Sequence, residues 1–153
     1  MPTIQPHIAF QTGHVGLNVS DLNRSKEFYQ QVFGFDILME SQDAGREFAF
    51  LGHDHNVVLT LWQQSSGGFA KNVPGLHHLS FQVGTIDDVL HIEDHLHHLN
   101  TKFLYEGVVP HAEGMQSGGI YFEDPDGIRL EIFSATGAGD YNSPSHGPSC
   151  GLF

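Results

Sequence analysis

The chain of 153 residues repeats one pattern twice. A short run that begins with His and alternates apolar with polar or small residues stands at positions 14–19, and a matching run stands at positions 78–83. Each run is followed by a helix-like segment and three more short apolar runs. The two closing hairpins align residue by residue, 50–62 with 121–133. Such self-similarity constrains the fold before any single residue does, and it predicts two βαβββ modules in an α+β domain.

In the first module, the strand at 14–19 places its Val and Leu residues on one face and its His, Gly and Asn residues on the other. Ser20 and Asp21 are residues that cap helix N-termini, and Gly34 is typical of the position after a helix. We therefore expect one helix between them. Further strands are expected at 35–40, 46–51 and 56–62.

The second module begins with the strand at 78–83. Thr85 and Asp88 form a capping-box pattern, and the helix that they start is expected to end near Asn100. Further strands are expected at 102–106, 115–123 and 128–134. The last two strands are separated by Asp-Pro-Asp-Gly at 124–127, which is a strong turn signal.

We expect residues 1–153 to form one domain, with module one at about 12–63, a linker at about 64–75, module two at about 76–134 and an irregular tail at 135–153. Each sheet has one apolar face for its helix and one polar face left over. If the polar faces oppose each other, the mostly antiparallel sheets form a cupped half-barrel.

Charge excludes several partners. The chain has 18 Asp and Glu residues against six Lys and Arg, a formal net charge of −12, and 12 His residues. So few basic residues argue against nucleic acid and against an anionic membrane surface. There is no long apolar run, the N-terminus does not resemble a signal peptide, and Cys150 is the only cysteine. These features favour a cytoplasmic protein whose partner is a small molecule.

Three residues with metal-binding side chains are predicted on the polar faces of the two sheets. His14 and His78 begin equivalent strands, and each belongs to the face opposite the apolar residues of its strand. Glu131 lies on the last strand, and its apolar neighbours belong to the opposite face. If the modules pair about a pseudo-twofold axis, these side chains converge. Two imidazoles and one carboxylate form a facial triad that leaves coordination positions open for substrate or O₂.

The motifs that carry these residues resemble those of the vicinal oxygen chelate superfamily, which includes glyoxalase, bleomycin resistance protein and extradiol dioxygenases. The resemblance runs from 14 to about 134 through HVGLNV at 14–19, HLSFQV at 78–83 and YFEDPDGIRLE at 121–131. It implies paired βαβββ modules and a divalent metal held by His14, His78 and Glu131, within one chain or across a homodimer. Fe(II) is favoured, and Mn, Ni, Co or Zn are alternatives.

The resemblance also bears on the reaction. Metal-binding members often carry a fourth carboxylate in the first module, where this chain has Thr60, so a glyoxalase I-like isomerase lacks its base unless Glu47 reaches the site. His111 and Tyr121 resemble the His and Tyr that assist ring cleavage in extradiol dioxygenases, and we predict them as catalytic residues. The acid-base His expected upstream of His78 has no match in this chain.

The other His residues are interpreted as having no catalytic or metal-binding role. His91, His95 and His98 follow helical spacing and are expected on a solvated face, and His77 is expected on the opposite side of the strand from His78. His7, His53, His55 and His146 are assigned to turns or to the ends of the chain.

Three functions remain open. The first is an extradiol dioxygenase-like enzyme that binds a small vicinal diol through two oxygens on the metal. The second is a glyoxalase I-like lyase or isomerase. The third is a non-catalytic, drug-sequestering resistance protein, for which the net charge of −12 would attract a cationic drug.

Overall fold

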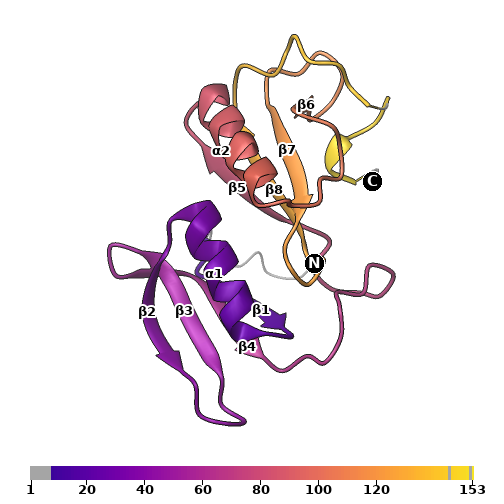
Figure 1. Cartoon of the computed structure of the whole chain (residues 1–153). Coiled ribbons are helices and arrows are strands. Elements are labelled where there is room, and N and C mark those ends of the chain that lie inside the picture. Colours follow the sequence, from indigo (N-terminus) through magenta and orange to yellow (C-terminus); the bar gives the residue numbers. More distant parts are fainter. Residues whose placement is uncertain (1–7, 145, 152) are drawn as a thin grey trace, which may run out of the picture.

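The first module folds as strand, helix and three strands, in the predicted order. The computed structural model describes residues 8–144, 146–151 and 153. The elements of this module, shown in Figure 1, are β1 (Val15–Val19), α1 (Leu22–Phe33), β2 (Asp36–Ser41), β3 (Phe48–His53) and β4 (Asn56–Gln63). Their strand order is β1-β4-β3-β2, with β1 parallel to β4 and the other pairs antiparallel.

Helix α1 begins and ends where its sequence predicts. The side chain of Asp21 accepts the N–H of Arg24, and Gly34 adopts a left-handed φ of 67° while its N–H donates to the carbonyl of Gln30. The helix buries Tyr29 completely against the sheet. The apolar side of β4 meets it through Leu59 and Leu61, which are also fully buried.

The second module repeats this topology. Its elements are β5 (Leu79–Val83), α2 (Ile86–His98), β6 (Val109–Pro110), β7 (Gly118–Glu123) and β8 (Arg129–Ser134). The strand order is β5-β8-β7-β6, and β5 runs parallel to β8. The expected capping box is present, because Thr85 and Asp88 each accept the backbone N–H of the other.

The strand predicted at 102–106 is wrong. This segment meets β7 at one isolated bridge, between Phe103 and Phe122. Gly107 then adopts a left-handed φ of 71°, which interrupts the extended backbone before the chain pairs with β7 again at Val109. The strand that pairs beyond this turn is β6, which is short and contains Pro110, a residue with no N–H to extend a ladder.

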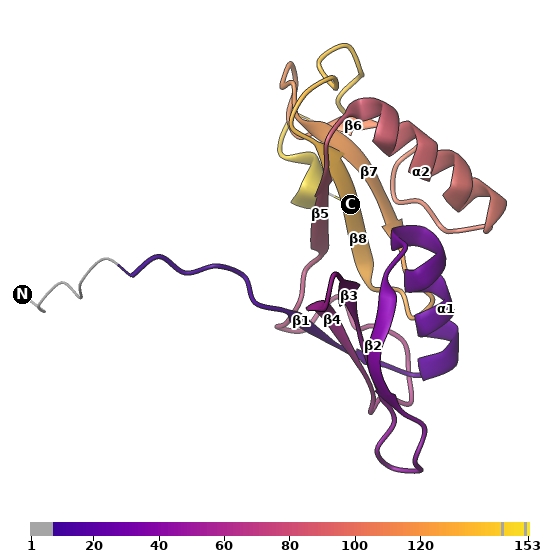
Figure 2. The same ribbon diagram turned by 90° about the vertical axis from the view of Figure 1, so that its left-hand side faces the viewer.

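The two modules share one apolar core through α1. The hydroxyl of Tyr29 donates to Asp124 of the second module at 2.9 Å, and the rings of Phe28 and Phe122 lie 6.4 Å apart. Figure 2 shows both helices on the same side of the two sheets, which lie one above the other. The helix-free faces of both sheets therefore look toward the opposite side of the molecule.

The described residues thus form an α+β protein of two βαβββ modules, each with an open four-stranded sheet. Within its described residues, no helix has the length and apolar character needed to cross a membrane. The tail at 135–144, 146–151 and 153 is irregular except for one short 3₁₀ helix, η1 (Ser149–Gly151).

Candidate metal centre

Glu131 is a buried acidic residue on the helix-free face of the second sheet. It lies on β8 between Leu130 and Ile132, whose side chains are buried in the core on the other face. The side chain of Glu131 is only 3% exposed. A buried carboxylate is costly unless it is paired or binds a metal. Its surroundings therefore decide what this site can do.

His78 is one partner of Glu131. Its Nε2 lies 3.4 Å from Oε2 of Glu131, because β5 runs beside β8 with Ser80 opposite Glu131. Burial lowers the pKa of His78, and the nearby carboxylate opposes this shift. The lowered pKa favours the neutral imidazole, which is the form that binds metals.

His77 lies beside His78, and the expectation that the two rings are on opposite sides is wrong. Their Nδ1 atoms are 2.8 Å apart and their ring centroids 5.1 Å apart. The reason is that β5 starts at Leu79, so both His residues precede the regular strand and escape its alternation. His77 therefore contacts the nitrogen of His78 that faces away from Glu131.

His111 is the second partner of Glu131. Its Nε2 lies 2.6 Å from Oε1 of Glu131, and its Nδ1 lies 2.8 Å from the hydroxyl of Ser117. The N–H of His111 also donates to the carbonyl of Ser117 at 2.9 Å. The ring is thus held at both nitrogens, directly beside the buried carboxylate.

Tyr121 lies opposite Glu131 in the register of β7 and β8. The residue is fully buried, and its hydroxyl lies 3.3 Å from the hydroxyl of Ser149 in η1. Burial raises the pKa of Tyr121, and the hydrogen bond with Ser149 opposes the rise. The phenol stays protonated at neutral pH and is available as a donor.

His14 is not part of this cluster within one chain. It is exposed and precedes β1, in the other sheet. In the described part of the chain, the ion-pair partners of Glu131 are His78 and His111. The same residues contain no group of three or more His, Cys, Asp or Glu arranged to hold a metal ion.

The first sheet presents aromatic residues on its helix-free face. Thr60, at the position equivalent to Glu131, is buried and accepts the indole N–H of Trp62 at 3.1 Å. The rings of Phe48, Phe50 and Trp62 contact one another there. Thr60 thus has a packing role, and it supplies no carboxylate.

The second module offers two side chains of kinds that bind divalent metals. His78 and Glu131 offer one imidazole and one carboxylate from neighbouring strands, and first-row metals accept both. One more imidazole would complete the facial triad, and His14 is the predicted source. His111 would then lie beside the carboxylate ligand.

Several residues of this site had no sequence signal. Ser117, Ser149 and Phe153 lie in irregular segments or at a strand boundary, where neither alternation nor a motif predicts a role. On β8 the ring of Phe133 packs against that of His111, with centroids 5.0 Å apart, and the guanidinium of Arg129 lies over the ring of Phe153.

The remaining His residues lie elsewhere. His91, His95 and His98 are exposed on α2, as expected, and Nε2 of His95 lies 3.0 Å from the carbonyl of Gln31 on α1. His55 lies in the turn between β3 and β4 with a φ of 63°. His7 lies outside the described residues.

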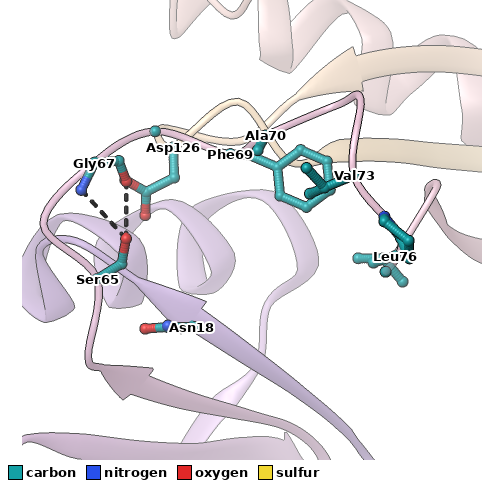
Figure 3. Close-up of a pocket in the computed structure, with 11 residues that line it drawn as sticks. Asn18, Ser65, Gly67, Phe69, Ala70, Val73, Leu76 and Asp126 are labelled. Carbon is teal, nitrogen blue, oxygen red and sulfur yellow. Dashed lines mark hydrogen bonds between the residues drawn. The ribbon is translucent and has the colours of Figure 1, made fainter.

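A cavity of about 240 Å³ lies between the linker and the turn at Asp126, away from the predicted site residues. Figure 3 shows Ser65 and Gly67 of the linker, Phe69 and Asn18 around it. The hydroxyl of Ser65 bonds both the carbonyl and the N–H of Gly67, so these polar groups serve the loop itself.

Known proteins resemble this chain along most of its length. YaeR of Escherichia coli (strain K12), an uncharacterised protein, is 30% identical over 134 residues, which cover 80% of this chain and 95% of YaeR. A trivalent organoarsenical cleaving enzyme of Bacillus sp. (strain MD1) is 28% identical over 90% of this chain and 80% of that enzyme. A probable lactoylglutathione lyase of Vibrio cholerae is 29% identical over 78% of this chain and 86% of that protein.

Solved structures show the same fold. A glyoxylase/bleomycin resistance protein/dioxygenase domain from Frankia sp. EAN1pec superposes with a TM-score of 0.71 at 26% identity, covering 83% of this chain and 98% of that one. A mutant of the fosfomycin resistance protein FosX of Listeria monocytogenes, solved with Mn(II), superposes with a TM-score of 0.65 at 20% identity, covering 84% of this chain and 95% of that one. A sequence profile of one superfamily matches residues 11–132. The chain therefore belongs to the Glyoxalase/Bleomycin resistance protein/Dioxygenase superfamily.

Proposed function

We propose that this chain is a metal-dependent enzyme of the extradiol dioxygenase type, acting on a small vicinal diol. The observation that carries the proposal is the buried Glu131, with His78 at 3.4 Å and His111 at 2.6 Å from its two oxygens. In this proposal His14, His78 and Glu131 hold the metal. Fe(II) is the favoured ion, and Mn, Ni, Co or Zn are alternatives.

The site we propose is completed by a second copy of the chain. The helix-free faces of both sheets look to the same side, so the first sheet of one chain does not oppose the second sheet of that chain (Figure 2). A twofold axis can bring the first sheet of one copy against the second sheet of another. His14 of one copy then meets His78 and Glu131 of the other copy.

The residues around the ligands have distinct tasks. A bound divalent metal supplies Lewis-acid polarisation and a template for two substrate oxygens. His111 holds or releases a proton at Nε2, because Ser117 fixes the ring through its other nitrogen. Tyr121 donates a hydrogen bond as a neutral phenol. Extradiol cleavage breaks the ring C–C bond beside the diol, and both atoms of O₂ enter the product.

The alternative function is a lyase or isomerase of the glyoxalase I type. Similarity to the probable lactoylglutathione lyase of Vibrio cholerae favours it. Thr60 argues against it, because the first module offers no carboxylate at that position to move a proton. The scarcity of Lys and Arg, six in total, also argues against a substrate with several carboxylates. In a non-catalytic binding protein, the buried pair of Glu131 and His111 would have no function.

The test is a measurement of metal content and O₂ uptake. The protein is purified anaerobically, loaded with Fe(II) and assayed with a panel of catechols. We expect bound Fe(II) and O₂ uptake coupled to ring cleavage. We expect the His111→Asn variant to keep its metal and lose at least about 100-fold in kcat. His91→Ala, on the exposed face of α2, is the matched control.

Metal binding without O₂ uptake on any diol would refute the dioxygenase. Activity of the Ni(II)- or Zn(II)-loaded protein on a hemithioacetal would then establish the lyase. Tight binding of a cationic drug by a chain that binds no metal would establish the sequestering protein.

A further inference from the structure

Phe153 covers part of the helix-free face of the second sheet. Its ring centroid lies 5.4 Å from that of Tyr121, 5.7 Å from that of Tyr105 and 5.7 Å from that of His77. The guanidinium carbon of Arg129 lies 5.1 Å from the same centroid. We call these four neighbours, Tyr105, Tyr121, His77 and Arg129, the ring cage.

The ring cage adjoins the candidate ligands. Phe153 also contacts the ring of His78 at a centroid distance of 6.4 Å, and Tyr121 lies opposite Glu131 in the strand register. Arg129 precedes Glu131 by two positions on β8, so both belong to one face of that strand. A molecule bound at Glu131 and His78 would therefore meet the space that Phe153 fills.

The 3₁₀ helix η1, which precedes Phe153, is anchored through its backbone and one hydroxyl. Ser149 is fully buried, and its hydroxyl donates to the carbonyl of Pro110 at 2.8 Å. Its N–H donates to the carbonyl of His111 at 2.9 Å, and its carbonyl accepts the hydroxyl of Tyr105 at 2.7 Å. These bonds hold η1 in place whether or not the ring of Phe153 is in the cage.

The ring of Phe153 is held more weakly than its anchor. It contributes ring–ring and cation–π contacts, and Phe153 is only partly buried. Such contacts depend on a planar π system and on its edges, and any aromatic ring of similar size can make them. The cage therefore selects a planar aromatic ring, and the phenyl group of Phe153 is one such ring.

We propose that the ring cage is the subsite for an aromatic ring of the substrate and that Phe153 is its internal occupant, which a ligand displaces. The location of the subsite beside the metal rests on the proposed function. The exchange between Phe153 and a ligand ring does not, because the cage consists of residues that need no metal. A closed occupant weakens apparent ligand affinity by the fraction of molecules in which the cage is free.

The test uses phenol, a neutral planar ring that lacks the second hydroxyl needed to chelate a metal. Binding of phenol to the full chain in the presence of a chelator is followed by NMR titration. We expect Phe153→Ala to bind phenol roughly tenfold more tightly than the unmodified chain. Cyclohexanol, of the same size but not planar, should show no such gain. Phe10→Ala, which removes an exposed ring elsewhere, is the matched control.

A second measurement follows the occupant directly. 4-Fluorophenylalanine is placed at position 153, and its ¹⁹F resonance should move to the solvent-exposed shift as phenol is added. An unchanged or weaker affinity of Phe153→Ala, or a ¹⁹F resonance that does not respond to bound phenol, would overturn the proposal. Because neither experiment measures turnover, a failed dioxygenase assay leaves this result standing, and the reverse also holds.

Discussion

At the scale of single residues, strand alternation predicted which face of the last strand carries Glu131. The apolar neighbours of Glu131 on β8 fixed the face on which its side chain lies, and the structure places His78 and His111 against it. Alternation failed at His77, because a strand boundary one residue later releases both His side chains. Ser149 and Phe153 could not be predicted, since their contacts arise from tertiary folding of an irregular tail.

The first prediction concerns the ligand set. Glu131→Gln keeps the size and shape of the side chain but removes the negative charge that a divalent ion requires. We expect metal affinity to fall by at least about 100-fold, measured by competition with a chromophoric chelator. Glu47→Gln, a partly exposed change in the first module, should leave metal affinity unchanged. An equal affinity of Glu131→Gln and the unmodified chain would remove Glu131 from the ligand set.

The second prediction concerns a buried carboxyl between the modules. Burial raises the pKa of Asp124 from its ordinary 3.8 to about 6, although hydrogen bonds from the backbone of Ile128 and the hydroxyl of Tyr29 oppose the rise. The folded chain therefore binds this proton more tightly than the unfolded chain does. The stability contribution of protonated Asp124 is complete below about pH 4 and is lost as pH rises through about 6.

Asp124→Asn removes this titration. We expect the free energy of unfolding of the unmodified chain, minus that of Asp124→Asn, to fall by roughly 1–3 kcal/mol between pH 4 and pH 7. Urea unfolding at several pH values measures this difference. Asp36→Asn, at an exposed position, should give a flat difference. A difference that stays flat or rises for Asp124→Asn would show that the carboxyl is not held protonated by burial.

At the scale of elements, the sequence predicted both helices and all but one strand. Caps at Asp21 and Thr85 and the apolar alternation were strong local signals. The failure at 102–106 has a physical cause: local β propensity does not reveal that this edge segment pairs with β7 at one bridge and that Gly107 then interrupts the extended backbone. Pairing at a sheet edge is decided by the neighbouring strand, which a local pattern does not contain.

The third prediction concerns the fit of β7 against β8. A Cβ atom added at Gly119 would lie 1.9 Å from the carbonyl oxygen of Ile132, which is far below contact distance. Gly119→Ala must therefore push β7 away from the strand that carries Glu131. We expect a loss of at least ~2 kcal/mol in the free energy of unfolding and a lower metal affinity.

The matched control for this change is Gly13→Ala. A Cβ added there has no heavy atom within 4 Å, and the position precedes the first strand. Chemical denaturation of both variants gives the comparison. If Gly119→Ala were as stable as Gly13→Ala, the close approach of the two strands would not constrain this residue.

At the scale of the whole molecule, the internal repeat predicted the α+β fold and its two modules, and the structure and the superfamily match confirm that class. The repeat alone could not place one module against the other. In the structure α1 packs on the second module, and both helix-free faces look to the same side (Figure 2). The proposed convergence of His14 with His78 and Glu131 would therefore require a second chain.

A metal centre shared between two copies of the chain can be tested by subunit complementation. His14→Ala and Glu131→Ala are prepared separately, and each should bind no metal at the site. Random mixing should make about half of the dimers mixed, each with one intact and one doubly broken site, so about a quarter of the wild-type metal should return. A mixture that binds no more metal than the two separate variants would contradict the shared centre.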